Sequence, residues 1–193
     1  MAQAIKTAEP GESLRADLRA ATMTAHDLLD HAMQAAGGWQ TRADYARFLG
    51  LQHAARAPIE AWLAANAPAD LVPPPQTGLI ARDLAALGTP LPPPAPLAAM
   101  GPCEPGTALG IAWVLAGSAL GNRAIARQVA KIGGGTWPTA FLDDEGAMVF
   151  WQELRTRIER PAAPGEAASA TRAAEAVFAH FLAVAEAPEG LPA

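Results

Sequence analysis

The chain has few of the residues that hold small extracellular proteins together. Its 193 residues include one tyrosine and one cysteine, Cys103. A single thiol excludes a disulfide framework, a thiolate zinc site and an iron–sulfur cluster, so we expect a reducing compartment and no chemical role for Cys103. The N-terminal stretch MAQAIKTAEPGESL lacks the apolar run of a secretory signal, and no run of about 20 apolar residues predicts a membrane helix. These absences predict a cytoplasmic protein.

Positive charge is also scarce. The chain has 14 lysines and arginines against 19 acidic residues, a formal net charge of -5. Nucleic acids and anionic membranes are bound through a basic footprint, so we expect neither as a partner. An anionic ligand would have to be met by a few local arginines.

The composition favours helices. Alanine, leucine and arginine dominate, β-branched residues are few, and proline gathers in the stretches VPPPQ and PLPPPAP. We predict an all-α, single-domain bundle over residues 13–187, between short tails at 1–12 and 188–193. Ser13 and Thr41 are the expected N-caps of the first two helices, Asp44 completes a capping box with Thr41, and Pro58 should kink the second helix. The predicted helices cover 13–35, 41–62 and beyond, 78–87, 107–131, 144–159 and 164–186.

The first predicted helix carries one polar face with a histidine at its centre. Six side chains recur at intervals of three and four: Arg19, Thr22, His26, Leu29, Asp30 and Met33. A neutral imidazole is a good ligand for heme iron, and its other nitrogen is normally oriented by a carboxylate, a carbonyl or water. Asp30 could supply that group, and Arg19 could meet a heme propionate. The alternative is a partly buried histidine capped by Asp30, with Arg19 as a solvated surface charge.

The fourth predicted helix has no charged residue over 105–122 and yet is interrupted repeatedly by glycine. Its glycines are Gly106, Gly110, Gly117 and Gly121. Each interior glycine costs on the order of 1 kcal/mol of helix stability relative to alanine, so something should compensate. Glycines let the backbone approach a flat ligand closely, and the pair Gly117 and Ser118 marks a place for a kink. Close helix packing through small residues and a membrane helix are the alternatives.

The motifs LRxxTxxxHxxLD, WVLAGSALGNRAIA and FWQELRTRI, with the proline-marked stretch HAARAPIE, resemble the heme oxygenase family in their order and spacing. The resemblance covers about residues 13–186 and is greatest to the bacterial branch associated with bacteriophytochromes. It implies a bundle of the heme oxygenase type with a glycine-kinked distal helix. It also implies an enzyme that opens heme b, both substrate and cofactor, to biliverdin, CO and ferrous iron. O2 and an electron donor, such as a ferredoxin or a flavoprotein reductase, would take part, and a bacteriophytochrome could receive the biliverdin.

The resemblance assigns roles around the iron. It makes His26 the proximal iron ligand and Asp30 the partner that orients its ring. Arg19 and Arg155 would meet the propionates and so fix how the heme is rotated in its pocket. Phe178, in the last helix, would pack near the heme.

On the distal side the chain departs from the family pattern. Gly117 and Gly121 correspond to the glycines whose backbone lies over the heme. The best-known members have an aspartate at the position of Ser118, where it holds the water that delivers protons. A serine hydroxyl can donate a hydrogen bond or anchor water, but it is not ionised. The bacteriophytochrome-associated branch often has glutamate at the position of Ala116 and glycine at that of Asn122.

Three other functions remain open. The replacements at Ser118 and Ala116 favour a heme-binding protein of the same fold without turnover. A ligand-free helical interaction module would give no Soret band when heme is added. The stretch HDLLDH favours a non-heme metal oxidase, but a di-iron bundle needs Glu-x-x-His pairs on other helices, and the sequence has none.

Overall fold

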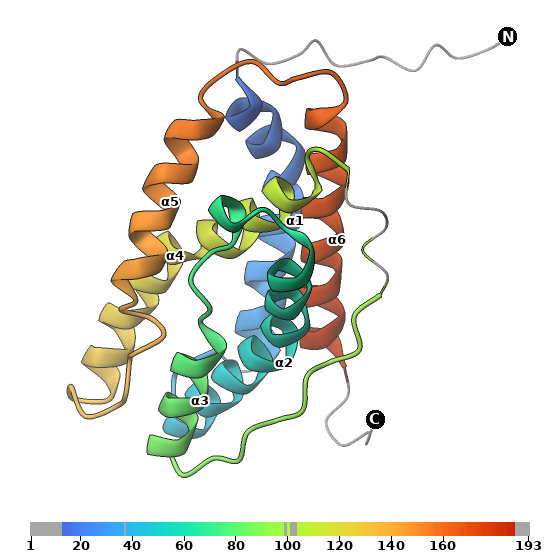
Figure 1. Ribbon diagram of the computed structural model, residues 1–193. Coiled ribbons are helices and arrows are strands. Elements are labelled where there is room, and N and C mark those ends of the chain that lie inside the picture. The colour runs from blue at the N-terminus through green and yellow to red at the C-terminus, as the bar shows by residue number, and fades with distance from the viewer. Residues whose placement is uncertain (1–12, 37, 99, 101–103, 188–193) are drawn as a thin grey trace, which may run out of the picture.

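The computed structural model describes residues 13–36, 38–98, 100 and 104–187, and these residues form helices and no strand. The elements are α1 (Leu14–Ala36), α2 (Arg42–Asn66), the short 3-10 helix η1 (Ala69–Leu71), α3 (Thr77–Ala86), α4 (Thr107–Ile132), α5 (Glu145–Ile158) and α6 (Glu166–Glu186) (Figure 1). The predicted all-α class and the six helices are confirmed, and η1 is an addition. Cys103 and both predicted tails lie outside the described residues.

Local sequence signals set the helix ends. The Ser13 hydroxyl accepts a backbone N–H of the first turn of α1 at 3.3 Å. Gly38, with a φ of +60°, follows the end of α1 in a conformation that side chains disfavour. Thr41 and Asp44 form both bonds of the predicted capping box, at 3.1 and 3.0 Å. Helix α2 continues past Pro58, and the kink expected there stays a prediction.

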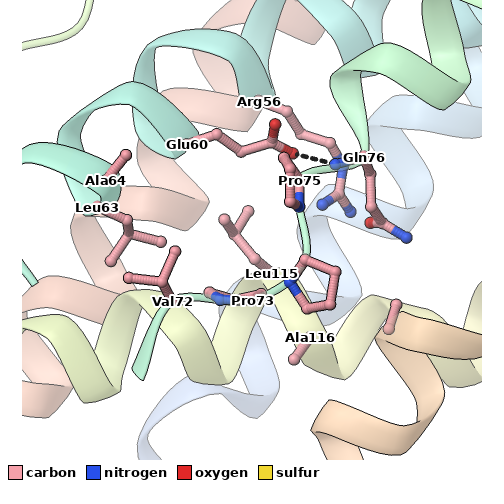
Figure 2. A pocket seen from close by; sticks show the side chains of 12 residues that line it. Arg56, Glu60, Leu63, Ala64, Val72, Pro73, Pro75, Gln76, Leu115 and Ala116 are labelled. Atoms are coloured by element: carbon pink, nitrogen blue, oxygen red, sulfur yellow. Dashed lines mark hydrogen bonds between the residues drawn. The ribbon is translucent and has the colours of Figure 1, made fainter. Parts of the chain in front are cut away.

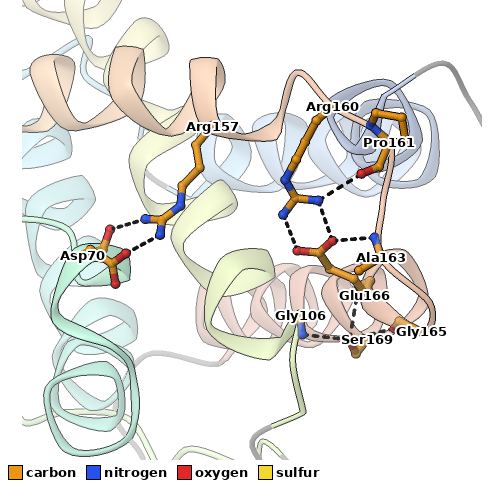
Figure 3. Close-up of polar contacts among 9 residues, drawn as sticks. All are labelled: Asp70, Gly106, Arg157, Arg160, Pro161, Ala163, Gly165, Glu166 and Ser169. Atoms are coloured by element: carbon orange, nitrogen blue, oxygen red, sulfur yellow. Dashed lines mark hydrogen bonds and ion pairs between the residues drawn. The ribbon is translucent and has the colours of Figure 1, made fainter.

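The last helix, α6, holds α1 and α4 in place. Both α1 and α4 pack along α6, and within the described part of the chain they make little contact with each other. At the top of α6 the Arg160 guanidinium forms a two-pronged ion pair with Glu166, at 2.7 and 2.8 Å (Figure 3). The backbone N–H of Gly106 donates to Ser169 Oγ at 3.0 Å, which fastens the start of α4 to α6. Arg157 of α5 donates to both the carboxylate and the backbone carbonyl of Asp70 in η1 (Figure 3).

Two of the α4 glycines are required by this packing. A Cβ atom added at Gly110 would lie 2.0 Å from the carbonyl oxygen of Ala170, and one added at Gly106 would lie 2.3 Å from that of Glu166. Both contacts are with the backbone of α6, which cannot move aside. Close helix packing therefore accounts for these two glycines.

Helix α4 is continuous across Gly117 and Ser118, so the kink expected there also stays a prediction. The Ser118 hydroxyl donates to the Leu115 carbonyl at 2.8 Å, a bond of the kind that often bends helices. The charge-free span is shorter than a membrane crossing, but the whole of α4, up to Ile132, is long and apolar enough for one. Half of its most apolar stretch is buried against the other helices.

The buried apolar side chains form two clusters that divide the bundle across its length. The first cluster contains residues of the early part of α1, the later part of α2, the first part of α4, α5 and α6. The second cluster contains residues of the end of α1, the start of α2, α3 and the end of α4. Along α1 no residue is buried between Thr22 and Met33. Along α4 the first cluster ends at Ala119 and the second begins at Ala126. We call the polar side chains at and beside this boundary the polar seam. Its members are His26, His53, Arg56, Ser118 and Asn122.

Candidate functional site

His26 lies in the middle of α1 with its ring open to solvent on one side. Its side chain is 60% exposed, and its ring meets the edge of Phe178 of α6 at a centroid distance of 6.3 Å. Nδ1 lies 3.6 Å from a carboxylate oxygen of Asp27 and equally far from one of Asp30, just beyond direct hydrogen-bond distance. Nε2 forms no hydrogen bond or ion pair with the described residues, so this nitrogen can bind a metal.

A metal ion at His26 would need further ligands from elsewhere. The described residues contain no group of three or more histidine, cysteine, aspartate or glutamate side chains that could hold a metal. Heme supplies four nitrogen ligands of its own and needs only an axial side chain. The donor set at His26 therefore fits heme and does not fit a di-iron centre.

Helices α1 and α4 meet at one point and separate beyond it. The Trp113 indole N–H donates to the Thr22 hydroxyl at 3.4 Å, and the Trp113 ring packs on Trp151 of α5 at 5.0 Å. In Figure 1, α1 then runs down the centre of the molecule, whereas α4 runs to the lower left. His26 follows Thr22 by one helical turn and Gly117 follows Trp113 by one turn. His26 and Gly117 therefore lie one turn beyond this contact on two helices that diverge, and we call the region between these two helices the gap.

The α4 wall of this gap has glycines that the protein's own packing does not require. A Cβ atom at Gly121 would have no neighbour within 4 Å, and one at Gly117 would touch the Trp151 ring at an ordinary 3.5 Å. Large apolar side chains on both walls are also open to solvent, with Met23 of α1 57% exposed and Leu120 of α4 54% exposed. An apolar, flat ligand in the gap would cover them.

Two unpaired arginines lie at one end of the gap. The ion pair between Arg15 and Glu159, at 2.8 Å, joins the start of α1 to the end of α5. Arg19 and Arg155 are each one turn further from that contact, so they face the same space. Neither forms a hydrogen bond or an ion pair with the described residues. Arg19 precedes His26 by about 10 Å along the helix axis, so a carboxylate of a ligand at His26 could reach it. The Arg155 charge acts through space on Glu159.

Ser118 forms two hydrogen bonds within the protein, and its expected role toward a ligand stays a prediction. Its hydroxyl accepts a hydrogen bond from the Arg56 guanidinium at 2.7 Å and donates its only proton to the Leu115 carbonyl. In this arrangement the hydroxyl has no proton free for a ligand. Asn122, one turn further, is 6% exposed, and its Nδ2 has no partner among the described residues.

Arg56 is a functional candidate that the sequence analysis missed. It is 2% exposed, donates to Gln52 Oε1 at 3.1 Å and lies over the rings of Phe141 and Phe181 at 5.2 and 5.8 Å. Burial lowers the pKa of the guanidinium to about 10, and two nearby carboxylates oppose that shift, so the group stays charged at neutral pH. Its position on the buried face of α2, between Leu49 and Ile59, was the available signal.

Arg56 also borders a cavity of about 90 Å³ on another side of α4 (Figure 2). The cavity lies among α2, the segment 72–76 and the α4 residues Leu115 and Ala116. In Figure 2 the Arg56 side chain descends from α2 toward this space, and Glu60 binds the backbone of Gln76 at 2.9 Å. His26 does not border this cavity.

Comparison with known proteins identifies the fold. No protein-family model matches the chain, and no curated protein matches it. A crystal structure of the NO- and CO-bound heme oxygenase from Neisseria meningitidis does match, with a TM-score of 0.63 over 94% of this chain and 99% of that chain, at 21% sequence identity. The chain therefore has the heme oxygenase-like fold, as the sequence predicted.

Proposed function

We propose that the protein binds heme between α1 and α4 and is a heme oxygenase of the bacteriophytochrome-associated branch. The observation that carries the proposal is the contrast among the α4 glycines. Gly106 and Gly110 are needed by the packing of α6, whereas no close backbone contact requires a glycine at Gly117 or Gly121, which lie beyond the Trp113–Thr22 contact as His26 does. The heme oxygenase-like fold supports the same placement.

Each residue of the gap would have its own role in binding heme. His26 Nε2 would be the axial ligand, and Asp30 would keep Nδ1 protonated through a bridging water and so fix the ring. Arg19 and Arg155 would pair with the propionates, and Phe178 would pack beside His26. Because this pairing fixes the rotation of the ring, the two arginines would also select which meso carbon faces the oxygen.

The proposed reaction takes heme b as substrate and yields biliverdin, CO and ferrous iron, with O2 and electrons from a ferredoxin or a flavoprotein reductase. The backbone at Gly117 and Gly121 would hold the distal face close and exclude bulk water. Asn122 would hold a water molecule through its free Nδ2. We place this activity in the cytoplasm, where the biliverdin could pass to a bacteriophytochrome.

Heme binding without turnover is a second candidate function. It is favoured by Ser118, which cannot ionise and whose proton is engaged with the Leu115 carbonyl. Proton delivery would then depend on ordered water alone.

The test uses the purified protein and hemin. We expect a Soret band on titration, its loss or marked weakening in His26→Ala, and its retention in His31→Ala. His31 is the matched control because it is an exposed histidine of the same helix whose Nδ1 contacts the Asp27 carbonyl. Adding ascorbate or a reduced ferredoxin in air should then convert the Soret band to a bilin band. A Soret band that never converts supports the second candidate, and hemin binding that is unchanged in His26→Ala contradicts both.

A further inference from the structure

Arg56 is a buried cation without a directly paired carboxylate. Its hydrogen bonds go to the uncharged Gln52 and Ser118, and within the described part of the chain it forms no ion pair. The carboxylates that act on it through space are Glu60 and Asp144, and both are engaged elsewhere. Glu60 accepts from the backbone of Gln76 and from Thr77, and Asp144 accepts from the Gln76 amide and a backbone N–H of α5. A charge in this position costs free energy of folding unless something offsets it.

The contacts of Arg56 place it beside α4 at Ser118 and beside α6 at Phe181. The guanidinium binds Ser118, which follows Gly117 directly on α4. It also lies over Phe181 of α6, one turn beyond the Phe178 ring that meets His26. Arg56 and His26 thus approach neighbouring positions of α6 from α2 and α1.

The polar groups next to this charge include one buried donor that lacks an acceptor in the part of the chain that the structure describes, Asn122 Nδ2. A guanidinium can only donate, and the single proton of Ser118 is used by a helix carbonyl. The Nδ2 of Asn122, one turn beyond Ser118, is buried and has no acceptor among the described residues. A donor-rich, positively charged surface is complementary to a small anion with lone pairs.

We infer that Arg56, held by Ser118, makes the α4 side of the site selective for small anions as axial ligands of the iron. The inference depends on the proposed heme site and adds a specificity-determining residue to it. Azide and fluoride represent the ligand class, and imidazole is the neutral counterpart. Arg56 acts through its charge and through Ser118, without touching the iron.

The experiment measures ligand affinities in the hemin-loaded protein and three variants. Arg56→Met removes the charge and keeps much of the apolar stem, and Arg56→Lys keeps the charge. Arg127→Met is the matched control because Arg127 is an exposed arginine of α4, about 13 Å along the axis from Ser118, where solvent screens it. Azide and fluoride dissociation constants follow from the Soret shift, and the CO stretching frequency of the reduced protein reports the local field.

We expect Arg56→Met to bind azide and fluoride about tenfold more weakly, the size that one unit charge gives in a site of intermediate dielectric, with imidazole affinity little changed. Its CO stretching frequency should rise, since a positive field lowers that frequency. Arg56→Lys and Arg127→Met should stay close to the parent protein.

Equal anion affinities in Arg56→Met and the parent, with hemin bound in both, overturn the inference and leave the proposed function standing. A parent protein that takes up no hemin overturns both. If Arg56→Met does not fold, Arg56→Gln is compared with Arg56→Lys, and an equal ratio of azide to imidazole affinity in that pair overturns the inference.

Discussion

The three glycines inside α4, Gly110, Gly117 and Gly121, show that one residue type serves two purposes within a single helix. Each lowers helix propensity by about the same amount. At Gly110 the carbonyl oxygen of Ala170 fills the space that a side chain would need, whereas at Gly121 that space is empty. The sequence alone predicts that the glycines need compensation, but it cannot separate the two cases because the neighbour of Gly110 is Ala170 of α6, 60 positions away in the chain.

This difference predicts opposite effects of alanine at the two positions. Gly121→Ala should raise the free energy of unfolding of the heme-free protein by up to about 1 kcal/mol, because alanine is the better helix former and meets nothing. Gly110→Ala should lower it by about 1–3 kcal/mol through overpacking against α6. Urea unfolding of the heme-free proteins measures both.

Hemin titration of the same variants tests the role of Gly121. The added methyl group should weaken hemin binding in Gly121→Ala, although the protein is more stable. Hemin affinity equal to that of the parent would contradict the placement of a flat ligand against this part of α4.

At the scale of helices, the sequence predicts where a helix begins and ends, but it does not predict which residues of other helices pack around it. The capping box of Thr41 and Asp44 is local, so its residues identify it. The burial of Arg56 is not local, because the groups that enclose it come from α4, α6 and the segment before α5. The sequence therefore predicted the start of α2 correctly, but it did not predict the buried charge of Arg56 in the middle of that helix. His26 and Arg155 were found through a family pattern, and their proposed roles stay predictions.

The cap of α2 should contribute to stability without affecting the site. Thr41→Ala should lower the free energy of unfolding by about 1 kcal/mol, since it leaves a backbone N–H of the first turn without its acceptor. Thr41→Ser is the conservative control and should lose much less. Hemin affinity should be unchanged in both, because Thr41 lies about 22 Å along the helix axis from Arg56. Denaturant unfolding and hemin titration measure the two effects, and a weakened Soret titration in Thr41→Ala would contradict their independence.

At the scale of the molecule, an ion pair between Arg160 and Glu166 joins the segment after α5 to the start of α6. Hydrogen bonds from Arg160 hold the pKa of the Glu166 carboxyl below its usual value. A carboxyl with a lowered folded pKa stabilises the fold above its unfolded pKa of about 4.3 and loses that contribution as pH falls through the folded value.

Glu166→Gln should therefore be less stable than the parent at pH 7, and the difference should shrink as the pH falls below about 4. Thermal unfolding across this pH range measures it. Glu175→Gln, at an exposed glutamate of the same helix, is the control and should match the parent throughout. A stability difference between Glu166→Gln and the parent that stays constant down to the lowest pH would show that the ion pair does not cause it.

The gap between α1 and α4 also bears on how a product would leave. Both of its walls are continuous helices, so widening the gap would require α1 or α4 to bend or shift rather than a loop to open. A heme bound there as proposed would be a rigid planar contact between the two helices and would resist that movement. An opened, iron-free tetrapyrrole has neither the planarity nor the axial bond, so the act of cleaving the ring would itself loosen the grip and let the two halves of the bundle part.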